Sequence, residues 1–181
     1  MKNLIVILIL AVCLVGCKND DDTISPITED NSFSCYVNGE LFLPKDRIGF
    51  PTQAHGINVD VYPETNDWVL GFTNHGTNRS VTLFLKNVTT TGEYPVFAIE
   101  GDFGAPFELT KVHYSDTHLD DLFVSTDDTG NINVMELTLN SRIVLTFDNL
   151  ILDGLALDGT VNTDTLILTD GMLNINLDTL D

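Results

Sequence analysis

Apolar side chains alternate with polar ones in short runs along this chain, and this alternation limits the fold more than any other feature. The first run, residues 33–37 (FSCYV), is followed by Asn38-Gly39 and by a second run, residues 40–43 (ELFL). A period of two places every second side chain on one face of a β-strand. Asn-Gly between two such runs favours a tight hairpin, because both turn residues need a positive φ. We therefore expect the domain to open with an antiparallel hairpin.

Further apolar runs follow, separated by turn residues about every ten positions, and no window shows the capped 3.6-residue stripe of an amphipathic helix. Pro95 places its strand at a sheet edge, or itself at the start of a strand. Asp-Gly pairs at 153–154, 158–159 and 170–171 indicate turns, and the last of them joins the final two strands. The expected fold class is all-β, a single antiparallel β-sandwich or barrel-like domain of about ten short strands. After the first hairpin, strands are expected over residues 57–62, 68–72, 81–85, 94–99, 107–114, 122–126, 132–139, 143–147, 166–169 and 172–177.

Composition agrees with strands rather than helices. The chain has 20 Asp but only 7 Glu, and 21 Thr; Asp favours turns, and Thr favours strands. By alternation, Trp68 belongs to the core with its neighbours Leu70 and Phe72, and Leu173, Ile175 and Leu177 face the core while the two intervening Asn residues face water. Cys35 is expected to be a small buried hydrophobe rather than a reactive nucleophile.

The first 22 residues carry a lipoprotein signal. Met1-Lys2-Asn3 precedes twelve apolar residues, 4–15, and then Gly16-Cys17. Twelve helical residues reach roughly 18 Å, short of the roughly 30 Å hydrocarbon core, so the run predicts a cleavable signal. An ordinary secretory signal with a chance Cys is the alternative. We expect residues 1–16 to be removed, Cys17 to be acylated, residues 17–31 to form a flexible acidic tether, and 32–181 to form the β-domain.

Charge indicates where the protein resides and which partners it avoids. Loss of Lys2 with the signal changes the formal net charge from −19 to −20, which repels phosphate backbones and excludes nucleic acid as a partner. The expected partner is the membrane, reached through the lipid anchor. Lys18 followed by acidic residues 20–22 favours the outer membrane and export to the cell surface; a periplasm-facing position with a merely solubilising tether is the alternative.

Two motifs are shared with a known group of proteins. Residues 33–39 (FSCYVNG), soon after a lipobox and an acidic tether, resemble the opening of a family of uncharacterised small Bacteroidetes lipoproteins. Residues 166–173 (LILTDGML) resemble that family's closing strand pair, with Leu173 where Phe is commoner. The family's usual Ser-Gly-Thr-Phe strand is missing at 143–147. The resemblance implies an all-β fold and an envelope location, and it brings no catalytic residue.

Two polar segments are candidate metal sites. His113, Asp116 and His118 offer imidazole and carboxylate ligands that suit zinc or another transition metal, although no zinc motif of defined spacing is present. Asp127 and Asp128 could give oxygen ligands to calcium, which takes 6–8 of them, but the EF-hand pattern is absent. A solvated polar loop and ordinary hairpin-turn chemistry explain the same residues without a metal.

Ligand binding is the remaining functional hypothesis. Tyr36 and Tyr62 lie on the faces opposite their strands' aliphatic residues, so they are candidates for contact with a glycan. None of the common catalytic motifs occurs in the sequence. We therefore expect a non-catalytic binding or structural module of the envelope, with a glycan or an envelope protein as partner. The alternatives are a glycan-binding accessory surface lipoprotein and a hydrolase with an unrecognised carboxylate pair.

Overall fold

The computed structural model describes residues 29–49, 53–99, 107–119, 121–127, 129–155 and 164–180. The predicted signal peptide and Cys17 lie outside these residues. Within them, no helix is long and apolar enough to cross a membrane. The described residues form eleven strands: β1 (Ser32–Val37), β2 (Glu40–Phe42), β3 (Ile57–Tyr62), β4 (Asp67–Asn74), β5 (Arg79–Leu85), β6 (Gly92–Val96), β7 (Lys111–Asp116), β8 (Asp121–Ser125), β9 (Gly130–Thr138), β10 (Arg142–Leu155) and β11 (Thr165–Asn176).

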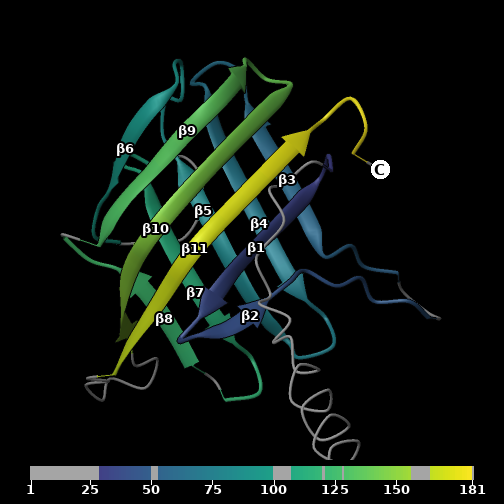
Figure 1. Cartoon of the computed structure of the whole chain (residues 1–181), viewed down its shortest axis with the longest axis vertical. Coiled ribbons are helices and arrows are strands. Elements are labelled where there is room, and N and C mark those ends of the chain that lie inside the picture. The colour runs from purple at the N-terminus through teal and green to yellow at the C-terminus, as the bar shows by residue number, and fades with distance from the viewer. Residues whose placement is uncertain are drawn as a thin grey trace, which may run out of the picture.

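All of these strands belong to one antiparallel sheet, which confirms the expected fold class. The order is β2-β1-β11-β10-β8-β7-β5-β4-β3, and β9 and β6 branch from β10. The branch arises because β10 is 14 residues long: its first half pairs with β9 and its second half with β8. The sheet curls on itself, so β1, β9, β10 and β11 cross in front of β3, β4, β5 and β7 (Figure 1).

The core fills the space between the two crossing layers. Phe33 of β1 stacks on Phe72 of β4, with ring centroids 3.9 Å apart, although the two strands are far apart in the sheet order. Cys35 and Trp68 are fully buried, as predicted, and burial raises the pKa of the Cys35 thiol to about 12. The two layers therefore share one apolar interior, which is the arrangement of a packed, barrel-like sandwich.

Hydrogen bonds outside the strand ladders hold the segments before β1 and after β2. The segment after β2 runs beside the end of β4, where the Lys45 amide donates to the Thr73 carbonyl (3.0 Å) and the His75 amide donates to the Lys45 carbonyl (3.1 Å). Just before β1, the Asn31 side chain accepts a hydrogen bond from the backbone amide of Asn176, at the end of β11 (2.9 Å). These contacts fix the chain that leads into and out of β1 and β2.

The last Asp-Gly pair does not form the predicted turn. Asp170 and Gly171 lie inside β11, which runs unbroken from residue 165 to residue 176, and Asp170 has φ of 51°. β11 has one more residue than β1 between the pairs Ser34↔Met172 and Tyr36↔Thr169, which is a β-bulge. The final two predicted strands are therefore one strand, and the positive φ that favours a hairpin is used for a bulge.

Asp153-Gly154 also forms no turn, because both residues lie within β10 and pair with β8. The third pair, at 158–159, lies outside the described residues. A further difference concerns β7: the predicted strand began at residue 107, but β7 begins at Lys111. Thr110 instead accepts hydrogen bonds from the Phe97 amide and, through its hydroxyl, from the Lys86 amide. Thr110 is therefore held by these two bonds and not by the hydrogen-bond ladder of a strand.

The edge-strand and core predictions have mixed outcomes. β6, which carries Pro95, pairs only with β9 and is an edge strand, which is the first of the two predicted positions. Pro95 is not at the start of the strand, which begins at Gly92. Leu173 and Ile175 are buried, as expected, but Asn174 is buried as well, with 3% of its surface exposed. Its side-chain amide donates to the Glu29 carbonyl at 3.2 Å, so the segment before β1 covers a residue that was predicted to face water.

Candidate functional site

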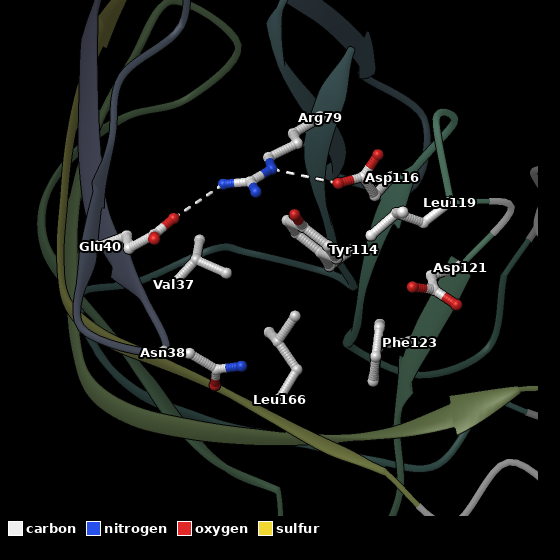
Figure 2. A pocket seen from close by; sticks show the side chains of 10 residues that line it. All are labelled: Val37, Asn38, Glu40, Arg79, Tyr114, Asp116, Leu119, Asp121, Phe123 and Leu166. Atoms are coloured by element: carbon white, nitrogen blue, oxygen red, sulfur yellow. Dashed lines mark hydrogen bonds and ion pairs between the residues drawn. The ribbon is translucent and has the colours of Figure 1, made fainter. Parts of the chain in front are cut away.

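A pocket of about 280 Å³ opens at the corner where the β1–β2 turn meets the starts of β5, β8 and β11 and the end of β7. Arg79, Glu40 and Asp116 lie in its upper part, and Leu166 and Phe123 lie in its lower part, with the Asn38 side chain beside Leu166 (Figure 2). The lining residues are Val37, Asn38, Glu40, Arg79, Tyr114, Asp116, Leu119, Asp121, Phe123 and Leu166.

Arg79 lies at the centre of the pocket and binds two carboxylates. Its Nε donates to Asp116 Oδ2 and its Nη1 donates to Glu40 Oε2, each at 3.1 Å. Asp116 faces Arg79 directly across the β5–β7 ladder, whereas Glu40 comes from β2 at the edge of the sheet. The hydrogen bond to Glu40, followed by the neighbouring Tyr114 and Asp116, raises the pKa of Arg79 above its ordinary value. Arg79 thus connects the edge of the sheet to its middle.

Two other lining residues, Asp116 and Asn38, are held in place by backbone amides. The Asp116 side chain is only 7% exposed, and its second oxygen accepts a hydrogen bond from the His118 amide at 3.0 Å. Asn38, in the positive-φ turn, accepts a hydrogen bond from the Ile167 amide at 2.8 Å and donates its own amide to the Ile167 carbonyl at 2.8 Å. Binding geometry set by such bonds is rigid before a ligand arrives.

Tyr114 forms the wall beneath the guanidinium. Only 4% of the residue is exposed, and its ring packs edge-on against Phe123 with centroids 6.1 Å apart. Burial raises the pKa of Tyr114 to about 12; Arg79 opposes the rise, and the carboxylates of Asp116, Glu40 and Asp121 add to it. The phenol therefore stays protonated and neutral at physiological pH, so it can both donate and accept a hydrogen bond.

Asp121 adds a third carboxylate. It opposes Asp116 in the last pair of the β7–β8 ladder, and like charges directly opposite each other on neighbouring strands destabilise a sheet. Arg79 neutralises Asp116 in this pair, whereas no ion pair within the described residues neutralises Asp121. The floor below consists of Val37, Phe123 and Leu166.

The predicted zinc ligands are not brought together. Asp116 faces the pocket, whereas His113 lies on the opposite face of β7, where its ring contacts Phe84 with centroids 5.5 Å apart. His118 is in the exposed turn after β7, and its Nε2 lies 3.0 Å from Asn78 Nδ2. In the part of the chain that the structure describes, no three His, Cys, Asp or Glu side chains form a group that could hold a metal ion.

The predicted calcium ligands are only partly described. Asp127 lines a second pocket of about 420 Å³ beside Pro95, Phe97, Gly130 and Asn131, and Asp128 lies outside the described residues. Among the side chains described there, Asp127 and Asn131 offer fewer oxygens than the six to eight that calcium takes. This second pocket also has fewer converging charged groups than the pocket around Arg79, which we therefore consider the candidate site.

The two tyrosines predicted to contact a glycan lie on different strands. Tyr36 is half-buried in β1, opposite Leu41 and Thr169. Tyr62 is 38% exposed at the end of β3, at the other end of the sheet order. Neither lines the pocket around Arg79.

Comparison with protein-family profiles, with curated proteins and with solved structures gave no match.

Sequence reasoning missed Arg79, Glu40 and Asp121 as members of one site, yet part of the signal was present. Arg79 occupies an odd-numbered position of β5, as Val81 and Leu83 do, so alternation places it on the core face of this strand. A charge on a core face needs a partner, because an unpaired buried charge is costly. The same reasoning applies to Asp116, which lies on the same face of β7 as Tyr114.

Proposed function

We propose that this chain is a non-catalytic lipoprotein of the cell envelope, anchored in the outer membrane through lipid on Cys17, whose β-domain binds a small ligand in the pocket around Arg79. The sequence supports the anchor: a short apolar run ends at Gly16-Cys17. The acidic residues after Lys18 favour a surface-exposed position. The domain would then be held at the envelope and meet its ligand there.

The pocket around Arg79 carries the binding half of the proposal. Six strands and two turns bring polar groups together beside an apolar floor, and this combination is typical of small-molecule sites. Two of the three carboxylates are hydrogen-bonded to Arg79, so neither is presented to a substrate as a free acid. The described lining residues include no histidine that could serve as a base beside a nucleophile. Binding without turnover is the function that this arrangement favours.

The anchor is tested by Cys17→Ser. The full-length variant should move from the membrane fraction to the soluble fraction of the cells, and mass spectrometry of the unchanged protein should show acyl chains on Cys17. Membrane retention of the variant, or an unacylated polypeptide that still begins at Met1, would contradict the anchor.

The binding half is tested with the full-length protein against a panel of sugars, amino acids, amines and carboxylates. Chemical-shift changes should gather at the backbone amides of Val37, Tyr114 and Phe123 for at least one compound and leave β3 unaffected. Release of a product from any compound would contradict a non-catalytic role. Absence of any shift at the pocket would contradict binding there.

A further inference from the structure

The pocket around Arg79 holds two side chains, those of Tyr114 and Asp121, whose polar groups make no hydrogen bond or ion pair within the described residues. The Tyr114 hydroxyl makes no hydrogen bond within the described residues, although only 4% of the residue is exposed. In Figure 2 the hydroxyl points into the pocket, below the guanidinium of Arg79. The hydroxyl oxygen itself opens onto the cavity, because it is not one of the buried side-chain atoms without a partner. It can therefore donate a hydrogen bond to a molecule bound there or accept one from it.

The charges around that hydroxyl select the kind of molecule. Arg79 is the lining residue with a positive charge, and three lining residues, Glu40, Asp116 and Asp121, carry negative charges, which leaves the pocket with a formal charge of −2. Arg79 binds two of the carboxylates but carries one positive charge, so Glu40, Arg79 and Asp116 together keep one negative charge. The second uncompensated negative charge resides at Asp121. An anion entering this pocket meets net repulsion, and a cation meets net attraction.

The size and the floor of the pocket limit the rest of the molecule. About 280 Å³ is slightly below the roughly 300–1,000 Å³ of pockets that hold drug-sized ligands. Val37, Phe123 and Leu166 line the lower part with apolar surface (Figure 2). A short hydrocarbon chain fits this surface, whereas a sugar would place most of its hydroxyl groups against apolar side chains and only some near the Asn38 amide.

We propose that the pocket binds the protonated amino group of a small aliphatic amine, or of a longer molecule that ends in one. The ammonium group lies between the Asp121 carboxylate, which accepts a charge-assisted hydrogen bond, and the Tyr114 oxygen, which accepts another. The carbon chain lies on Val37, Phe123 and Leu166. This inference rests on the proposed binding function and names its ligand class.

Binding of n-butylamine, n-butanol and butyrate to the full-length protein, measured by chemical-shift titration, tests the proposal. The three probes have the same carbon chain and differ in the charge of the polar end. We expect n-butylamine to bind at least tenfold more tightly than n-butanol and butyrate to show no binding. Added NaCl should weaken n-butylamine binding, because salt screens the attraction of a surface carboxylate.

Two pocket variants and one matched control separate the named contacts from the general charge of the protein. Asp121→Asn should weaken n-butylamine binding about tenfold or more, since a hydrogen bond to a charged group is lost. Tyr114→Phe should weaken it about two- to tenfold. Asp60→Asn removes the same charge from the exposed face of β3 and should leave the affinity unchanged.

Different failures overturn different statements. Equal binding of n-butylamine to wild type and to Asp121→Asn overturns the assignment of the ammonium to Asp121. Binding of butyrate or of a sugar at the pocket, without n-butylamine, overturns the amine proposal and leaves the binding function intact. No shift at the pocket with any amine, sugar, amino acid or carboxylate overturns both.

Discussion

Gly171 is the residue on which the course of β11 depends. It lies directly opposite Phe147 of β10, and the Phe147 ring covers the position that a Cβ atom would occupy. An aromatic ring that packs over a glycine on the neighbouring strand also fixes the register of the pair. Asp170, with its positive φ, and Gly171 together make the bulge, so one residue supplies the backbone conformation and the other supplies the space.

Gly171→Ala should lower the free energy of unfolding by about 1–3 kcal/mol, because the added methyl group overlaps the Phe147 ring and forces it to move. Gly71→Ala is the matched control: the nearest atom to its Cβ would be the Asn58 carbonyl oxygen at 3.6 Å, an ordinary contact. It should change the free energy by less than about 1 kcal/mol. Urea unfolding measures both, and equal losses would show that Phe147 does not fill the space at Gly171.

Arg79→Met should lower the free energy of unfolding by about 1–3 kcal/mol, because it leaves the nearly buried Asp116 carboxylate without its cation. Arg142→Met is a matched control. Both arginine side chains are 36% exposed, but Arg142 contacts the more exposed Asp30 and Glu136 at 3.7 and 3.8 Å. Such pairs contribute about 0–1 kcal/mol. A loss for Arg142→Met as large as that for Arg79→Met in urea unfolding would contradict this ranking.

His113 makes stability depend on pH. Burial, and then the charge of Lys111, lowers the pKa of His113 to about 4, while an unfolded histidine titrates near pH 6.5. Between these values only the unfolded chain takes up the proton, so stability falls as pH falls from about 6.5 to 4, by at most about 1.4 kcal/mol per pH unit. His113→Gln should flatten this part of the urea-midpoint profile.

His55→Gln serves as the control for that profile, because the His55 side chain is 52% exposed. This variant should keep the slope of the unchanged protein between pH 6.5 and 4. The assignment to His113 would be wrong if both variants flattened the profile equally.

At the scale of the elements, β10 and β11 bend together. The buried positions of β11 are even-numbered at Leu166 and Leu168 and odd-numbered at Leu173 and Ile175. In β10 the buried positions change from odd-numbered to even-numbered at the same level, between Phe147 and residue 150. Because the two strands keep their register, the bend keeps the apolar face of the pair on the core along its whole length.

Most strands follow from local alternation, and this is why the sequence predicts β1 to β5, β8 and β9 closely. The bulge at Asp170-Gly171 does not follow, because a positive φ next to glycine suits a hairpin and a bulge equally. The choice between them depends on Phe147, which is more than twenty residues away. The pocket fails to follow for the same reason: Glu40 and Arg79 meet only when the sheet curls, and no local pattern encodes that closure.

Hydrogen exchange should reflect the place of each strand in the sheet. β11 has neighbours on both sides, β1 and β10, whereas β6 pairs only with β9. Amides in β11 should therefore exchange at least tenfold more slowly than the amides of β6, since opening an edge strand breaks one ladder and opening β11 breaks two. Mass spectrometry of peptides measures the exchange. Equal protection of the amides in β6 and β11 would contradict the assigned strand order.

At the scale of the whole molecule, charge opposes the packed core. The formal net charge of −19 comes from 27 acidic and 8 basic residues, and like charges on a compact domain repel one another. The proposed amine site uses the same field: a negative surface attracts cations toward the pocket and repels anions before they reach it. The negative net charge therefore lowers the stability of the folded domain and favours cationic ligands.

This cost makes thermal stability depend on salt. Raising NaCl from about 10 mM to about 300 mM shortens the screening length from roughly 30 Å to well under 10 Å, so Tm should rise, by about 2–4 °C for each kcal/mol of repulsion removed. A triple variant, Asp60→Asn, Glu64→Gln and Asp153→Asn, removes three exposed charges and should show a smaller rise from a higher starting Tm. Scanning calorimetry at the two salt concentrations separates this effect from a specific cation site, because NaCl and KCl should act equally on repulsion. A Tm that does not change with either salt would mean that the acidic residues of the fold are already compensated by their neighbours.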